Sequence, residues 1–345
     1  MKLARSLTVT LLALALMPPA EAGVPKCFGK TPTIVGTRGR DFLEGTGGHD
    51  VMQALGGDDV VYGYGGNDLI CGHDGNDSIE GHIGHDRLSG GLDNDGLRPG
   101  AGNDVMRGGA GRDSMWPDDP GESLDGGPGR DAVVFDSVPG PVRVDLARRA
   151  AKLAGSRVPV RRIEVVYGSG KGDVLLGSKD DDNLVGFGRD DRIEGRAGDD
   201  TIQGDATYGG AAGDDYLSGG PGRDMISGDA NERHGGRDVI RGGDGGDTLF
   251  GDMLENEGGS GPAADRIFGG DGPDTIYGDY VINSAGPELT ELGAPDAIEA
   301  GAGADVVYGE GGDDQVDGGD GEDTAHGGTG NDTCEATENE ESCEG

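Results

Sequence analysis

The chain has 345 residues, of which 74 are glycine, and its formal net charge is −38. Only 33% of its residues are hydrophobic and 4% aromatic, which is little for a globular domain of this length. A chain this acidic and this poor in apolar side chains either stays disordered or is ordered by something other than a hydrophobic core. With 66 Asp and Glu against 28 Lys and Arg, a multivalent cation is the obvious agent. The same charge argues against nucleic acid as a partner, because the phosphates would be repelled.

The first 22 residues have the features of a secretory signal peptide. Lys2 and Arg5 precede an apolar run over residues 7–17, which is too short to span a membrane. Residues 20–22 then supply small side chains at a cleavage site. We therefore expect a secreted chain that starts at Gly23 and has no transmembrane segment.

A period of nine residues runs through most of the remaining chain. Nine units cover residues 36–116, one isolated unit covers 126–134, and fifteen more run with spacers from 168 to 335. Position 6 is Asp in every unit, from Asp41 to Asp332, position 4 is mostly Gly, and position 8 is a large apolar residue except in the last two units. A flexible glycine-rich linker would not keep a carboxylate and an apolar side chain two residues apart. The period is therefore structural.

Each unit predicts a tight glycine-rich turn followed by a strand of three residues. In that strand the side chain at position 8 points inward, while positions 7 and 9 point to solvent. Two units form one flattened coil of 18 residues, and stacked coils hydrogen-bond as parallel strands. The sequence therefore predicts an all-β fold, a parallel β-roll. One apolar side chain per unit makes a core too thin to hold this fold alone.

The carboxylates at position 6 can complete the fold. Stacked coils place them in two columns at the strand spacing of roughly 4.8 Å, where they repel one another unless a cation lies between them. Calcium takes six to eight oxygen ligands in a flexible cage and can use backbone carbonyls as well as carboxylates. The candidate calcium ligands are Asp41, Asp50, Asp59, Asp68, Asp77, Asp86, Asp104, Asp113, Asp191, Asp200, Asp215, Asp224, Asp238, Asp247, Asp265, Asp274, Asp305, Asp314, Asp323 and Asp332.

The units at residues 63–71 and 72–80 show the pattern most clearly. It resembles the Gly-Gly-x-Gly-x-Asp-x-apolar-x repeat of the RTX, or haemolysin-type calcium-binding, family. The resemblance implies a β-roll loaded with several calcium ions, with the position-6 aspartates as ligands. Calcium binding is doubtful near Lys171 and Arg189, where a cation replaces the glycine at position 4. Because of its N-terminal signal, the chain resembles the short, stand-alone secreted members of the family.

The period divides the chain into five segments. These are the signal peptide (1–22), the first array (23–116), an insertion with one isolated repeat (117–167), the second array (168–335) and a C-terminal disulfide cap (336–345). Alternating residues in the insertion predict strands, which we expect to form a β-hairpin-like unit docked on the roll. Eight of the 28 basic residues lie between residues 143 and 171. They either neutralise a nearby acidic edge or form a patch for an anionic partner such as a cell-wall polymer.

Four spacers interrupt the second array, and two repeat units separate each spacer from the next. They begin at Gly204-Asp205, Gly228-Asp229, Gly251-Asp252 and Gly278-Asp279. Because two units make one coil, all four spacers leave the roll on the same side. Repeat proteins often gather insertions on a binding face, but loops are also simply tolerated at a surface, and both interpretations stay open.

The four cysteines fall into two groups near the ends of the mature chain. Export makes disulfides feasible, and this placement suggests the pairs Cys27–Cys71 and Cys334–Cys343. Zinc is the weaker alternative, because the sequence has no Cys-x-x-Cys pair. The six histidines do not form a metal-binding pattern either.

Taken together, the sequence favours a secreted, extracellular calcium-binding protein with a structural or surface-interaction role and no enzymatic activity. One alternative is a haemolysin-like toxin, although toxins of this family carry a large apolar region ahead of the repeats, which this chain lacks. The other is an accessory folding module of an extracellular hydrolase. Against it, we find no catalytic motif and no stretch long enough for a catalytic domain.

Overall fold

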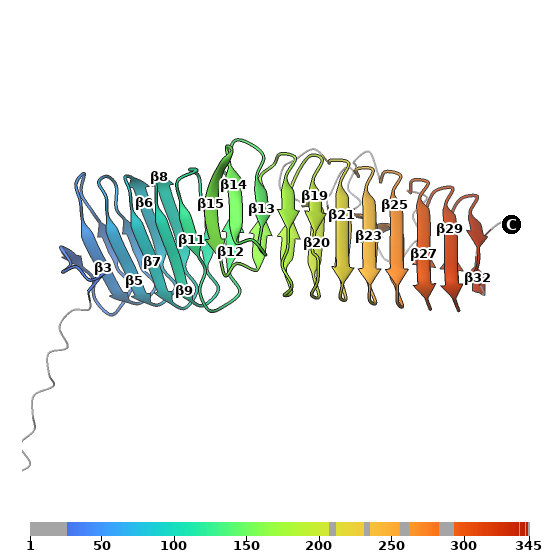
Figure 1. The fold of residues 1–345 in the computed structure, drawn as a ribbon, viewed down its shortest axis with the longest axis horizontal. Coiled ribbons are helices and arrows are strands. Elements are labelled where there is room, and N and C mark those ends of the chain that lie inside the picture. The colour runs from blue at the N-terminus through green and yellow to red at the C-terminus, as the bar shows by residue number, and fades with distance from the viewer. Residues whose placement is uncertain are drawn as a thin grey trace, which may run out of the picture.

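The computed structural model describes residues 26–206, 212–230, 235–255, 262–282, 293–337, 339–341 and 343. The predicted signal peptide and most of each spacer lie outside these ranges. The described residues form strands joined by turns and loops, in a long solenoid whose strands lie across its axis (Figure 1). Within this part of the chain no helix is long and apolar enough to cross a membrane.

The roll consists of two long sheets, and successive strands along the chain belong almost alternately to one sheet and to the other. Neighbouring strands within each sheet are parallel, except for three antiparallel strands described below. The first sheet has 17 strands: β1 (Ile34–Val35), β3 (Val51–Gly56), β5 (Leu69–Asp74), β7 (Arg87–Leu92), β9 (Val105–Ala110), β11 (Ser123–Asp125), β13 (Arg143–Asp145), β14 (Ala150–Leu153), β15 (Ser156–Arg161), β17 (Val174–Leu176), β19 (Arg192–Glu194), β21 (Tyr216–Pro221), β23 (Val239–Asp244), β25 (Arg266–Asp271), β27 (Ala297–Gly303), β29 (Gln315–Gly321) and β31 (Thr333–Glu335). The second sheet has 15 strands: β2 (Phe42–Glu44), β4 (Val60–Tyr62), β6 (Ser78–Ile83), β8 (Gly96–Ala101), β10 (Ser114–Met115), β12 (Ala132–Val134), β16 (Val165–Tyr167), β18 (Asn183–Val185), β20 (Thr201–Ala206), β22 (Met225–Ala230), β24 (Thr248–Glu255), β26 (Thr275–Ile282), β28 (Val306–Tyr308), β30 (Thr324–His326) and β32 (Asn339–Glu341).

The register of the strands matches two repeat units per coil. Met52 lies opposite Ile70, and Ile70 lies opposite Leu88, so each coil advances by 18 residues. These position-8 side chains are fully buried, as are their counterparts Val61 and Ile79 in the second sheet. The core is thus two files of single apolar side chains that run the length of the roll. The predicted parallel β-roll is confirmed.

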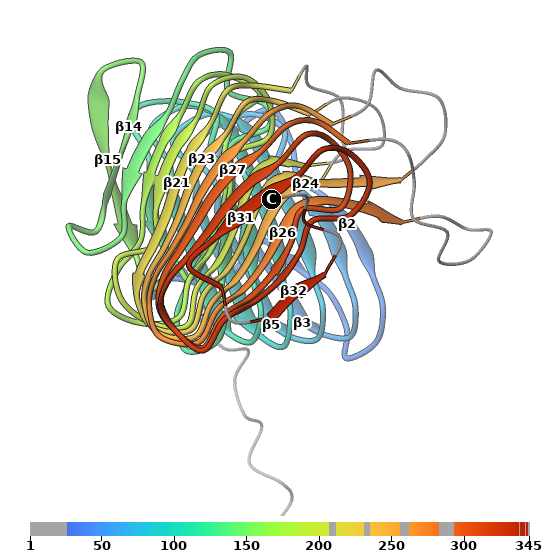
Figure 2. The same ribbon diagram turned by 90° about the vertical axis from the view of Figure 1, so that its right-hand side faces the viewer.

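The spacers do not interrupt the stacking of the coils. Each spacer follows β20, β22, β24 or β26, which are consecutive strands of the second sheet. In the end-on view, β24 and β26 extend beyond the outline of the coils on the side opposite β14 and β15 (Figure 2).

The insertion contains the expected hairpins, but it is built into the roll rather than docked on its surface. Strands β13, β14 and β15 form an antiparallel meander. Its outer strands pair in parallel with strands of the roll on either side, β15 with β11 and β13 with β17 of the second array. In the second sheet, β16 pairs with both β12 and β18. The meander satisfies the backbone hydrogen bonds at the ends of both arrays and so joins them into one roll.

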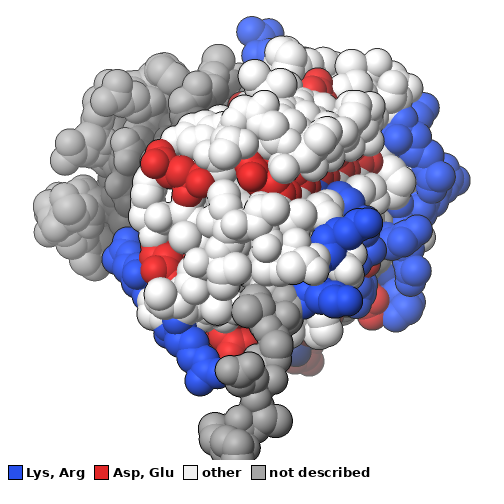
Figure 3. All heavy atoms as spheres, turned by 90° about the vertical axis from the view of Figure 1, so that its left-hand side faces the viewer, with Lys and Arg blue, Asp and Glu red and all other residues white. Residues whose placement is uncertain are grey.

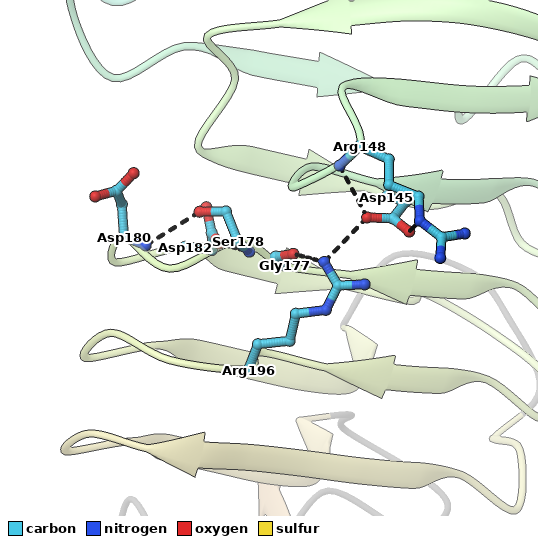
Figure 4. Close-up of polar contacts among 7 residues, drawn as sticks. All are labelled: Asp145, Arg148, Gly177, Ser178, Asp180, Asp182 and Arg196. Atoms are coloured by element: carbon cyan, nitrogen blue, oxygen red, sulfur yellow. Dashed lines mark hydrogen bonds and ion pairs between the residues drawn. The ribbon is translucent and has the colours of Figure 1, made fainter.

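A side-chain contact fastens the end of β13 to the second array (Figure 4). The Nη1 group of Arg196 donates to Oδ1 of Asp145 at 3.0 Å and to the carbonyl oxygen of Gly177 at 2.6 Å. Arg148 lies against the same carboxylate. The two guanidinium groups and the backbone N–H of Arg148 hold the pKa of Asp145 below its usual range despite burial.

The repeat unit at residues 126–134 is not isolated, because residues 117–125 form a degenerate unit before it. Glu122 takes position 6 and Leu124 takes position 8 of that unit. Leu124 lies opposite Met106 and is fully buried. The replacement of Asp by Glu, together with the missing glycines, concealed this unit. The signal that could have revealed it is an acidic residue two places before a large apolar one.

Both expected disulfides are present, Cys27–Cys71 and Cys334–Cys343. The first ties the start of the described chain to β5, and the second closes a loop at the C-terminal end. All four cysteines are paired, so none is available as a zinc thiolate in this structure.

Candidate calcium sites

The position-6 aspartates form two ladders, one beside each sheet. Along each ladder, the backbone N–H of one aspartate donates to Oδ1 of the next aspartate, one coil further on, as from Asp68 to Asp86 at 2.7 Å. This hydrogen bond spans 21 gaps between coils, of which seven lie in the first array, 13 in the second, and one between Asp113 and Asp131. It persists where spacers lengthen the separation from 18 residues to 24, 23, 27 or 31.

The other carboxylate oxygen, Oδ2, is buried and accepts no hydrogen bond in most of these aspartates. They are Asp59, Asp68, Asp77, Asp86, Asp95, Asp104, Asp113, Asp131, Asp191, Asp200, Asp215, Asp224, Asp238, Asp247, Asp265, Asp274, Asp296, Asp305, Asp314 and Asp332. A buried carboxylate oxygen without a partner is costly, and native proteins avoid it unless a cation is bound. Asp323 belongs to the same ladder, since its Oδ1 accepts the N–H of Asp305.

The glycine at position 1 leaves room for an ion beside most of these Oδ2 atoms; the exceptions are Asp59, Asp104 and Asp305, whose units begin with Ala54, Pro99 and Ala300. A Cβ atom at Gly63 would lie 2.6 Å from Oδ2 of Asp68 and 2.9 Å from the carbonyl oxygen of Gly81, one coil further on. These separations are close to the calcium–oxygen distances found in proteins, about 2.3–2.6 Å. The space that the missing Cβ leaves is therefore lined by a carboxylate of one coil and a carbonyl of the next. These donors fit calcium, which the aspartates of both ladders would hold.

Burial makes these carboxylates hard to ionise in the absence of a cation. It raises the pKa of Asp68 to about 6 and that of Asp77 to about 7, and neighbouring carboxylates in the ladder add to the shift. The pKa of Asp95 rises to about 8 for the same two reasons. The backbone N–H that each carboxylate accepts offsets only part of this cost. A divalent ion would favour the ionised form and remove the penalty.

Each array begins with two units in which Oδ2 of the aspartate accepts a hydrogen bond from the residue at position 2. Thr46 at position 2 donates to Oδ2 of Asp50 through its backbone N–H at 2.7 Å and through its hydroxyl at 2.8 Å. The equivalent pairs are Thr37 with Asp41 and Ser169 with Asp173. At Asp182, which is drawn with Ser178 in Figure 4, only the N–H of Ser178 donates to Oδ2, and Oδ1 is buried and accepts no hydrogen bond. Two of the predicted ligands, Asp41 and Asp50, thus have protein donors where the inner coils offer an unpartnered oxygen.

Sequence reasoning omitted three aspartates whose geometry matches that of the predicted ligands. They are Asp95, Asp131 and Asp296, and each has a buried Oδ2 that accepts no hydrogen bond. Asp93 and Ala294 replace the position-4 glycine in two of these units. The residue at position 2, rather than the glycine at position 4, therefore separates the two kinds of carboxylate.

The insertion interrupts the ladder of the first sheet. In the second sheet, Glu164 takes the place of the aspartate, and its Oε2 accepts the N–H of Asp131 at 2.9 Å. In the first sheet, Val142 and Val158 stand at the corresponding positions of β13 and β15. The meander therefore separates the carboxylates of the first array from those of the second along this sheet.

The two kinds of aspartate should differ in calcium binding. We expect Asp68→Ala to lower the number of bound calcium ions, because its Oδ2 has no other partner. Asp173→Ala should leave the number unchanged, because Ser169 already donates to Oδ2 of Asp173 through its N–H and its hydroxyl. Equilibrium dialysis with atomic absorption gives the stoichiometry of each variant. An equal loss in both would show that position 2 does not decide binding.

Comparison with known sequences agrees with this geometry. No curated protein matches the chain. The profile described as RTX calcium-binding nonapeptide repeat (4 copies) matches eight stretches, which together exceed half of the chain: residues 35–70, 62–97, 100–119, 185–206, 209–231, 234–253, 260–280 and 293–325. Because this profile matches more than half of the chain, and because the structure contains both aspartate ladders, the chain belongs to the RTX calcium-binding nonapeptide-repeat family and is a calcium-binding repeat protein.

Proposed function

We propose that this chain is a secreted, non-enzymatic protein whose roll is ordered by calcium outside the cell and then presents a surface to a partner. The observation that carries the proposal is the pair of ladders of buried, unpartnered carboxylate oxygens. A site with few carboxylates belongs to the weak class of extracellular modules, with Kd values on the order of 10⁻⁴–10⁻³ M. Such sites fill where calcium is abundant. The two disulfides and the signal-like N-terminus support the same location.

The two alternatives make different predictions for the calcium-loaded protein. A haemolysin-like toxin would lyse membranes, and an accessory module of an extracellular hydrolase would copurify with, or carry, hydrolytic activity. Our proposal predicts neither. Dye release from lipid vesicles and hydrolysis of ester and peptide substrates, both at millimolar calcium, distinguish the three functions.

A row of cations on the meander is the surface that favours an anionic partner. Arg143 lies opposite Lys152, and Lys152 lies opposite Arg157, across three neighbouring strands. All three residues are exposed, and none forms an ion pair with an acidic residue of the described chain. Like charges directly opposite one another destabilise a sheet, so the row costs stability that a bound anion would recover.

The surrounding surface supports this assignment. Lys and Arg gather along one flank of the roll in Figure 3, the flank on which β14 and β15 protrude in Figure 2. Two other cations of the insertion are neutralised, since Arg148 pairs with Asp145 and Arg162 with Asp125. Neutralisation of an acidic edge therefore accounts for some of the basic residues but not for the row.

Replacing the row should weaken binding to a polyanion. We expect the triple variant Arg143→Gln, Lys152→Gln, Arg157→Gln to elute from heparin–agarose at lower salt than the wild type, with calcium present throughout. The variant should also lose binding to the native cell surface in a pull-down. A charge-matched control replaces three scattered, exposed arginines, Arg112, Arg130 and Arg223, with Gln. Equal elution of both triple variants would contradict the proposed surface.

A further inference from the structure

Four aspartates of the second array form a column that the nonapeptide pattern does not require. They are Asp205, Asp229, Asp252 and Asp279, which stand at position 2 where each spacer begins. Their backbones lie in register on consecutive strands of the second sheet. Each side chain is at most 1% exposed. The column is therefore buried beside the ladder of position-6 aspartates that precedes the first-sheet strands.

One oxygen of each of these aspartates holds the base of a spacer. Oδ2 of Asp205 accepts the N–H of Gly213 at 2.6 Å, where the chain returns to the roll. Oδ2 of Asp252 accepts the N–H of Ala263 at 2.7 Å in the same way. The equivalent pairs are Asp229 with Gly236 and Asp279 with Ala294. This contact explains why a carboxylate or amide is useful at these positions, but it uses only one oxygen of each.

The other oxygen, Oδ1, is buried in all four aspartates and accepts no hydrogen bond. Together with position-6 aspartates, the column forms three groups in which one ligand oxygen from each carboxylate lies within 4.8 Å of the others. The groups are Asp191, Asp205 and Asp215; Asp229, Asp238 and Asp252; and Asp252, Asp265 and Asp279. None of these aspartates forms an ion pair with a Lys or Arg of the described chain.

Burial makes the bare carboxylates of these groups hard to ionise, as it does in the two ladders. Burial, with the charge of Asp229 next, raises the pKa of Asp252 to about 8. Burial and the charges of Asp215 and Asp229 raise the pKa of Asp205 to about 10. Where the spacers begin, the edge of the second array therefore carries two buried carboxylates per coil, whereas the first array carries one. No basic side chain among the described residues pairs with these carboxylates.

We propose that these three groups are calcium sites of a second kind, each built on three carboxylates, and that Asp252 serves two of them. The ligands are all oxygens, which suits calcium, and its affinity rises with the number of charged ligands and the rigidity of the site. Three fixed carboxylates place these sites in a tighter class, with Kd values of about 10⁻⁵ M or lower. This inference rests on the calcium-dependent folding proposed above, and its test separates the two.

Because the two kinds of site differ in affinity, calcium should fill them in sequence. As calcium rises, the three groups bind first and hold the coils between Asp191 and Asp279 together, along with the bases of the spacers. The first array and the C-terminal coils fill later, at the weaker class of site. A spacer surface would then be positioned at calcium concentrations that leave the first array unfolded.

The test compares calcium binding by the wild type with a quadruple variant, Asp205→Asn, Asp229→Asn, Asp252→Asn and Asp279→Asn. Asn keeps a carbonyl oxygen for the backbone N–H at the base of each spacer, so only the charge and one ligand oxygen are lost. Titration with calcium in the presence of a competing chromophoric chelator should show about three tight ions in the wild type and none in the variant. Far-UV circular dichroism at millimolar calcium should remain near that of the wild type.

Single variants keep the test decisive if the quadruple variant does not fold. Asp252→Asn should remove two tight ions, because it belongs to two groups, and Asp205→Asn should remove one. The control removes four exposed charges elsewhere, Glu299→Gln, Asp317→Asn, Asp320→Asn and Glu322→Gln, and should retain all three tight ions.

The proposal is overturned if the wild type has no tight class, or if Asp252→Asn binds as many tight ions as the wild type. The second result would mean that protons, rather than calcium, neutralise the groups. Neither result would affect calcium-dependent folding itself, which fails if the wild type is folded in chelator or if magnesium folds it equally well.

Discussion

Removing calcium at neutral pH should unfold the protein, and returning it should refold the roll in steep, cooperative steps, with the coils between Asp191 and Asp279 ordered first and the first array later. The apolar core cannot hold the coils by itself, because it is two files of single side chains such as Ile70 and Ile79. Glycine makes the entropic cost of ordering high, and there are 74 glycines in the chain. Without an ion, every inner coil also buries carboxylate oxygens that accept no hydrogen bond.

The energy available from calcium is large enough to decide the outcome. A site that binds only the folded chain contributes about 1.4 kcal/mol when calcium is at ten times its Kd. Ten such sites contribute about 14 kcal/mol, which is the size of the whole stability of an ordinary domain. One ion in each gap would also bring about 40 positive charges, close to the formal net charge of −38. Each coil templates the next, so the transition should be cooperative.

Far-UV circular dichroism during a calcium titration measures this transition, with magnesium as the control. Magnesium requires a stricter octahedral geometry and gives up its water reluctantly, so it should not substitute at the same concentration. Full β-structure in chelator, or equal folding by magnesium, would show that calcium is not what orders the roll.

The periodic part of the fold could be predicted because two periods coincide in this sequence. The strand period of two places position 8 in the core, and the coil period of 18 stacks Asp68 under Asp86. Both depend only on residues within one or two units. The ladders and the core files follow from them, whereas the disulfides were predicted from the placement of the cysteines.

What the sequence did not reveal depends on contacts between neighbouring coils or on position 2, where this chain often departs from the glycine of the family repeat. Position 2 looked variable, yet Thr46 satisfies Asp50 there, while Asp205 joins a cluster with Asp191 and Asp215. The insertion was misplaced because its strands have no repeat grammar. Their parallel partners, β11 and β17, lie far from them in sequence, and only closure of the sheet identifies them.

Acid should restore structure to the calcium-free protein. A carboxyl whose pKa is higher in the folded chain than in the unfolded chain binds more protons when folded. The free energy of unfolding then rises as the pH falls from the folded to the unfolded value. Burial raises the pKa of Asp95 to about 8, that of Asp77 to about 7 and that of Asp68 to about 6, whereas an unfolded aspartate titrates near 3.9. The free energy of unfolding of the calcium-free protein should therefore increase as the pH falls from about 8 to about 4.

The stabilisation that calcium provides should decrease as the pH falls over the same range, because protons compete with calcium for the carboxylate ligands. The stabilities of the calcium-loaded and calcium-free proteins should converge as the pH approaches 4, since protonation neutralises the ladders in both. Urea midpoints followed by circular dichroism, from pH 8 to pH 4 with and without calcium, measure both curves on dilute protein. If the calcium-free chain gains no β-structure on acidification, the cost of charge in the ladders is not what keeps it unfolded. The thin core and the entropy of its glycines would then be the reason, and calcium would act by bridging coils rather than by neutralising them.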